Sequence, residues 1–214
     1  MKRDFTELVF ILDRSGSMSG LESDTIGGYN GMLEKQKNEP GEAIVTTVLF
    51  DDKYELLHDR INLKGVAPMT SKEYFVRGST ALLDAIGLTI SKIGNAQQNT
   101  VESERAEHVL FVITTDGMEN ASREYGYDVI HKIISHQKEK CGWEFLFLGA
   151  NIDAVATAGK LGIGKDHAVN YRPDSTGTEK LYNAVNMAAC SLRKSGSFNP
   201  GWKADLEEDY NRRS

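Results

Sequence analysis

Four short apolar runs constrain the fold of this chain more than any other feature of its sequence. They lie at residues 8–12, 43–50, 109–113 and 145–148 and are rich in Val, Ile, Leu and Phe. Apolar and polar residues do not alternate along them. Strands have this composition when helices cover both faces of their sheet. The runs therefore predict buried strands of a mainly parallel sheet.

Helical patterns fill the segments between these runs. Apolar residues recur at helical spacing within residues 82–93, 125–134 and 181–192, and a first helix is expected at about residues 22–37. Strands that alternate with helices predict an α/β fold, with a doubly wound sheet and helices on both faces. Residues 54–61 follow a strand too closely for a parallel crossover, so we expect them to form an antiparallel edge strand.

The charge and hydropathy of the chain exclude several classes of partner. Its 214 residues include 25 Lys and Arg against 31 Asp and Glu, which gives a net charge of −6. A general binder of the phosphate backbone would carry a basic face, so we expect no nucleic-acid partner. No segment approaches the ~20 apolar residues of a membrane span, and the apolar run near the N-terminus is too short for a signal peptide. We therefore expect a cytoplasmic protein with no membrane partner.

Periodicity also predicts how the chain is divided. The strand and helix patterns run through residues 5–193, which we expect to form one domain. The pattern fades after this point, so residues 194–214 are expected to form a C-terminal tail. Phe198, Trp202 and Leu206 are the residues that would pin part of this tail to the domain.

Polar side chains stand where the predicted strands end. Asp13, Ser15 and Ser17 follow the first apolar run, Asp116 follows the third, and Thr80 precedes a predicted helix. Because ligands of a doubly wound sheet bind at the carboxyl ends of its strands, we expect these five side chains to meet at one edge. Oxygen ligands of this kind suit a hard cation, Mg²⁺ first, with Mn²⁺ or Ca²⁺ as substitutes.

The same residues allow plainer interpretations. Asp and Ser often form a turn or cap a helix, and a lone Thr80 is more typical of a helix N-cap than of a metal ligand. Neither a Walker P-loop nor a GxGxxG motif occurs, so nucleotide binding lacks its usual support.

Together the motifs resemble the metal-ion-dependent adhesion site (MIDAS) of the von Willebrand factor type A domain family, in its stand-alone intracellular form. The three pieces occur in order within residues 7–192: Asp13-x-Ser15-x-Ser17, a Gly-Ser-Thr-Ala-Leu segment around Thr80, and Thr-Asp-Gly around Asp116. The resemblance implies a six-stranded sheet with one antiparallel edge strand. It also implies that Ser15 and Ser17 bind the metal directly, Thr80 directly or through water, and the two aspartates mainly through water.

Five further polar residues lie near the same predicted edge. We interpret Asp51, Asp52 and Asp84 as residues behind the metal ligands or in solvent. Glu119 and Asn120 follow the third motif, and they either line a partner surface or belong to an exposed loop.

The function favoured by these observations is a Mg²⁺-dependent adaptor that is not an enzyme. Members of the resembled family often take an Asp or Glu side chain of a partner protein as the last metal ligand. The alternative is a Mg²⁺-dependent phosphoryl-transfer enzyme with Asp13 as nucleophile. That alternative lacks a second acid, since position 15 is serine. A metal-free scaffold is the third possibility.

A cytoplasmic protein should keep its two cysteines, Cys141 and Cys190, as free thiols. Chain denatured without reductant should therefore react with two equivalents of a thiol reagent. Reaction with none would indicate a disulfide and would contradict the expected location.

Overall fold

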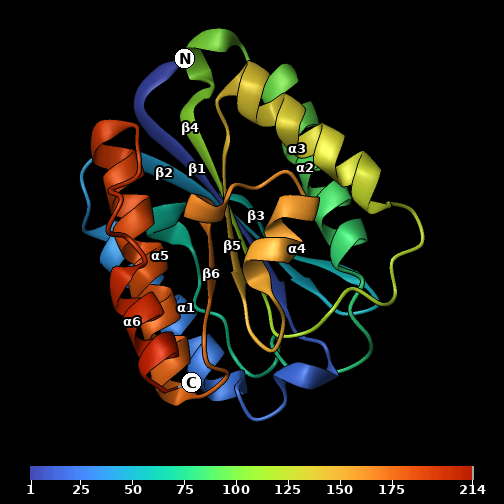
Figure 1. The fold of residues 1–214 in the computed structure, drawn as a ribbon. Coiled ribbons are helices and arrows are strands. Elements are labelled where there is room, and N and C mark those ends of the chain that lie inside the picture. The colour runs from blue at the N-terminus through green and yellow to red at the C-terminus, as the bar shows by residue number, and fades with distance from the viewer. Residues whose placement is uncertain (214) are drawn as a thin grey trace.

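Six strands form one mixed sheet at the centre of the structure, a computed structural model that describes residues 1–213 (Figure 1). Their bounds are β1 (Lys2–Asp13), β2 (Glu42–Phe50), β3 (Tyr54–Asn62), β4 (Ala106–Thr115), β5 (Glu144–Gly149) and β6 (Ala168–Asn170). The strand order is β3-β2-β1-β4-β5-β6, and only β3 runs antiparallel to its neighbour. The predicted α/β class and the antiparallel edge strand are therefore confirmed.

Helices cover both faces of this sheet (Figure 1). One face carries α1 (Glu22–Lys37), α5 (Ser175–Ser195) and α6 (Ala204–Arg212), and the other carries α2 (Leu82–Gln98), α3 (Tyr127–Cys141) and α4 (Ala154–Lys160). Side chains of β1 enter the two hydrophobic cores in turn, Leu8 and Phe10 on one side and Val9 and Ile11 on the other. This is why the strand sequences show no alternation. Within residues 1–213, none of the helices has the length and apolar content needed to span a membrane.

One predicted helical face differs from the structure. The pattern at residues 125–134 places Tyr125 and Val129 on a buried face, but α3 begins only at Tyr127 and Val129 is 48% exposed. The carboxylate of Asp84 accepts hydrogen bonds from the backbone N–H groups of residues 123–125, which holds this segment outside the helix. Ile130 and Ile134 supply the buried stripe of α3.

The C-terminal segment packs against the rest of the chain. Trp202 and Leu206 are 2% and 1% exposed and belong to the core beneath α5, as expected for residues that pin this segment. The indole N–H of Trp202 donates a hydrogen bond to the backbone carbonyl of Asp166 at 3.1 Å. The boundary between residues 5–193 and 194–214 stays a prediction, and Ser214 lies outside the described residues.

The sheet topology changes direction beside the end of β1. From β1 the chain proceeds outward to β2 and β3 on one side, and to β4, β5 and β6 on the other. Strand order thus reverses between β1 and β4, the place where doubly wound sheets bind ligands at their carboxyl ends. The pairing of Leu12 with Thr114 brings Asp13 next to Thr115 there.

Two adjacent glycines of α1 should respond oppositely to substitution by alanine. A Cβ on Gly28 would lie 2.3 Å from Cδ2 of the buried Tyr182 ring, whereas a Cβ on Gly27 would meet nothing within 4 Å. Gly28→Ala should lower the free energy of unfolding by about 1–3 kcal/mol through overpacking. Gly27→Ala should raise it by about 0.5–1 kcal/mol, because alanine is the better helix former. Urea denaturation of both variants tests the pair, and equal effects would contradict this packing.

Candidate metal centre

Three loops bring the five motif residues together at the carboxyl edge of the sheet. Asp13 is the last residue of β1, Ser15 and Ser17 lie in the turn after it, Thr80 precedes α2, and Asp116 follows β4. A chain of hydroxyl contacts connects four of them. Thr80 Oγ1 lies 3.0 Å from Ser15 Oγ, and Ser15 Oγ lies 3.1 Å from Ser17 Oγ. The hydroxyl of Ser17 donates a hydrogen bond to Asp116 Oδ1 at 2.5 Å. The structure thus assembles the expected set, although ligation of a metal by these residues stays a proposal.

Asp13 is held firmly by its neighbours. The backbone N–H of Ser15 donates to its Oδ1 at 2.7 Å, and the hydroxyl of Thr115 donates to its Oδ2 at 2.6 Å. The residue is 0% exposed. Burial raises the pKa of Asp13 to about 6, against the lowering effect of these hydrogen bonds, and the negative charge of Asp116 adds to the rise. A positive charge at this edge would therefore relieve an unfavourable concentration of carboxylates.

Asp116 carries the strongest sign of a missing ligand. Its Oδ1 accepts from Ser17, but its Oδ2 is buried and has no hydrogen-bond partner. A buried carboxylate oxygen without a partner is costly, and in a native protein it indicates a group that the atoms present do not supply. Burial also raises the pKa of Asp116. The observation fits a cation beside this oxygen.

The donor set fits a hard divalent cation better than a soft one. It consists of two carboxylates and three neutral hydroxyls, all oxygen. Across the described part of the chain, no group of three or more His, Cys, Asp or Glu side chains is arranged to hold a metal. Gly117 leaves room at the same place, since a Cβ there would lie 3.1 Å from Ser17 Oγ and 3.4 Å from Thr80 Oγ1.

Glu119 and Asn120, which follow the third motif, hydrogen-bond to the segment around Thr80, and Asn120 is also exposed. The side-chain oxygen of Asn120 accepts from the backbone N–H of Thr80 at 2.9 Å. The carboxylate of Glu119 accepts from the N–H groups of Leu83 and of residues 121 and 122 at 2.7–2.9 Å. Glu119 is therefore occupied within the molecule, and both residues help to hold Thr80 at the start of α2.

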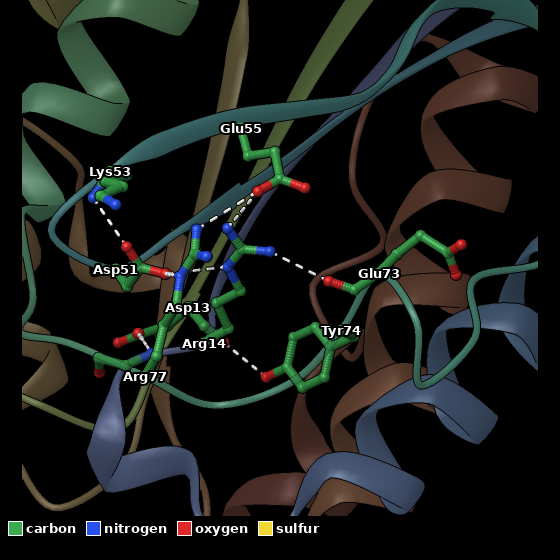
Figure 2. A network of polar contacts seen from close by, with 9 residues as sticks. Asp13, Arg14, Asp51, Lys53, Glu55, Glu73, Tyr74 and Arg77 are labelled. Atoms are coloured by element: carbon green, nitrogen blue, oxygen red, sulfur yellow. Dashed lines mark hydrogen bonds and ion pairs between the residues drawn. The ribbon is translucent and has the colours of Figure 1, made fainter.

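Sequence reasoning gave Arg14 no role, and it placed Thr115 in the third motif without identifying its partner. Arg14 lies between two motif residues yet is 0% exposed, and its guanidinium pairs with Asp51, which is also 0% exposed (Figure 2). Asp51 was expected behind the ligands or in solvent, and it lies behind them. A charged residue inside a motif is a weak signal, because the sequence does not reveal which distant carboxylate it meets. The threonine before Asp116 gave no signal of its hydrogen bond to Asp13.

Comparison with known proteins supports the fold. No model of a protein family matches the sequence, and no curated protein matches it. Several solved structures match the fold. They include proximal thread matrix protein 1 from the mussel byssus with a zinc-occupied MIDAS motif, at TM-score 0.60 and 14% identity over 89% of this chain and 47% of that chain.

Two further structures resemble the chain. The ArnB paralog VWA2 from Sulfolobus acidocaldarius has a TM-score of 0.53 and 18% identity over 87% of this chain and 45% of that chain. The vWF domain of the type V pili tip protein Mfa5 from Porphyromonas gingivalis has a TM-score of 0.56 and 10% identity over 85% of this chain and 95% of that chain. This chain has the fold of a von Willebrand factor type A domain, and it spans about half the length of the mussel and Sulfolobus proteins.

The raised pKa of Asp13 predicts how the stability of the metal-free protein depends on pH. The folded chain keeps a proton on Asp13 up to about pH 6, whereas the unfolded chain releases it near 3.8, so the folded state binds more protons between these values. The free energy of unfolding in EDTA should therefore fall as the pH rises through this window. A shift from 3.8 to about 6 corresponds to a loss of about 3 kcal/mol.

Asp13→Asn is the control for this slope, because the amide does not titrate. Urea denaturation between pH 4 and pH 7 should show the difference in stability between wild type and Asp13→Asn decreasing with pH. A difference that stays constant across the window would contradict the assignment to Asp13.

Proposed function

We propose that this chain is a Mg²⁺-dependent protein-binding module that recognises a carboxylate of a partner protein. The observation that carries the proposal is the partnerless, buried Oδ2 of Asp116 beside the converging hydroxyls of Ser15, Ser17 and Thr80. Such an arrangement is stable when a cation occupies it and strained when it is bare.

Each residue of the site would have a defined part. Ser15, Ser17 and Thr80 would offer neutral oxygens, and Asp13 and Asp116 would balance the charge, mainly through water. Mg²⁺ is the preferred cation because every donor is a hard oxygen, with Mn²⁺ or Ca²⁺ as substitutes. A divalent cation supplies electrostatic attraction for one more oxygen ligand from outside the chain.

The site is open on the side from which a partner would approach. Ser17 is exposed, and Met118, two residues after Asp116, is 75% exposed. An Asp or Glu side chain of a partner would meet the cation there. The proposal includes an adaptor role in the cytoplasm, and the two free thiols, Cys141 and Cys190, are consistent with it.

The proposal also holds that the chain is not an enzyme. A phosphoryl-transfer enzyme would need Asp13 to present a free oxygen to its substrate. In the structure Asp13 is 0% exposed, and each of its carboxylate oxygens already accepts a hydrogen bond. This geometry favours a structural role for Asp13 over attack on phosphorus.

Ser15→Ala combined with Ser17→Ala should abolish metal-dependent binding while the fold persists. The two hydroxyls are neutral ligands outside the hydrophobic cores, so circular dichroism should not change. For wild type, millimolar Mg²⁺ should raise the melting temperature by mass action, and this rise should disappear in the double variant. Isothermal titration calorimetry with Mg²⁺ should agree.

A matched double variant, Ser23→Ala with Ser71→Ala, removes two exposed hydroxyls outside the motif and should behave as wild type. Partner capture should require Mg²⁺ and be lost in EDTA, and replacing the contacting Asp or Glu of the captured protein by Asn or Gln should abolish it. If wild type neither binds Mg²⁺ nor gains stability from it, the proposal is wrong.

A further inference from the structure

A buried arginine occupies the middle of the first motif. Arg14 lies between Asp13 and Ser15 in sequence, yet its side chain forms ion pairs with Asp51 and Glu55 (Figure 2). Its Nε lies 3.0 Å from Asp51 and its Nη2 lies 2.5 Å from Glu55. Its Nη1 donates to the backbone carbonyl of Glu73 at 3.0 Å. A fully buried guanidinium is tolerated only when its donors are paired in this way.

Arg77 pairs with the same two carboxylates. Its Nε lies 2.6 Å from Asp51 and its Nη2 lies 3.4 Å from Glu55 (Figure 2). Burial acts to raise the pKa of Asp51, but hydrogen bonds, with that from Arg77 foremost, and the charge of Arg14 outweigh it and lower the pKa. Two guanidinium groups and two carboxylates thus form one network of ion pairs beside the proposed metal site.

The segment that contains Arg77 connects this network to Thr80. The hydroxyl of Tyr74 donates to the backbone carbonyl of Asp13 at 2.5 Å (Figure 2). The backbone N–H of Arg77 donates to the carbonyl of Arg14 at 3.0 Å, and that of Gly16 donates to the carbonyl of Gly78 at 3.2 Å. Residues 73–78 therefore lie along the Asp13–Ser17 loop immediately before the chain reaches Thr80.

This segment has no helix or strand to position it. Between the short 3₁₀ turn Leu63–Gly65 and α2, the structure has no regular element. The 3.0 Å separation of Ser15 Oγ and Thr80 Oγ1 therefore depends on the contacts just described, together with the hydrogen bonds between Thr80 and Asn120. Side chains that support ligands from behind commonly set the affinity of a metal site.

We infer that five residues, none of them among the proposed ligands, position the metal loops, and that the affinity for a divalent cation depends on them. These residues, the brace, are Arg14, Asp51, Glu55, Tyr74 and Arg77. The inference rests on the proposed metal site, because it concerns positioning residues for that site.

Tyr74→Phe is the mildest test, because it removes one hydroxyl from the brace. The matched control is Tyr29→Phe, since both tyrosines are 0% exposed in the same core. The hydroxyl of Tyr29 is hydrogen-bonded to Thr47 and not to the metal loops. Calorimetric titration with Mg²⁺ and with Mn²⁺ should show affinity about 10-fold weaker in Tyr74→Phe and unchanged in Tyr29→Phe. The electron paramagnetic resonance line shape of bound Mn²⁺ should change only in Tyr74→Phe.

Asp51→Asn tests the ion pairs in the same way. Its control is Glu7→Gln. Glu7 lies in β1, is also fully buried, and pairs with Arg60 at 2.8 Å. Both variants should lose stability in EDTA, but only Asp51→Asn should weaken cation binding, by about 10- to 100-fold. Arg77→Lys, which keeps the charge on a partly exposed side chain, should lose less affinity than Arg77→Met.

The outcomes separate the two proposals. Wild type that binds neither cation would overturn the metal site and the brace together. Wild type that binds, with Tyr74→Phe and Asp51→Asn folded and equal to wild type in affinity, would overturn the brace alone. Equal loss of affinity in the brace variants and in their matched controls would also overturn it, because it would indicate a general effect of lowered stability.

Discussion

Strand β1 lies between β2 and β4 and is buried on both faces from Thr6 to Asp13. Its apolar side chains enter both hydrophobic cores, so its removal from water stabilises the two helical layers together. Because β2 and β4 run parallel to it, their carboxyl ends reach the same edge as Asp13. This burial places Asp13 and, through the pairing with β4, Asp116 at that edge, whereas the position of Thr80 depends on the contacts of the loop before α2.

The edge carries two electrostatic environments on opposite sides of one short loop. Toward Asp116, two buried carboxylates meet three hydroxyls, and burial raises the pKa of both acids. Toward Asp51, two arginines and two carboxylates balance one another. The first environment is short of positive charge, whereas both carboxylates of the second are paired with arginines. Ion-paired side chains behind the loop would hold the ligands of the proposed cation site in place.

The sequence alone determined the strands, most helices and the residues of the motif. Buried parallel strands have continuous apolar sequences, and helices have a periodic apolar face, so both are encoded locally. The same local signal placed Asp13, Ser15, Ser17, Thr80 and Asp116 at the ends of elements, and the structure brings them within reach of one another. The three-residue β6 and the seven-residue α4 are too short to show such periodicity.

Only the tertiary structure decided what surrounds the motif. Arg14 meets Asp51 across 37 residues, and Tyr74 meets the carbonyl of Asp13 across 61. Packing also gave Glu119 and Asn120 their partners, the backbone groups around the start of α2. Local sequence specifies which groups are polar and where an element ends. Which distant donor satisfies a buried acceptor depends on how the elements pack, because burial creates the requirement for a partner and packing determines which one is near.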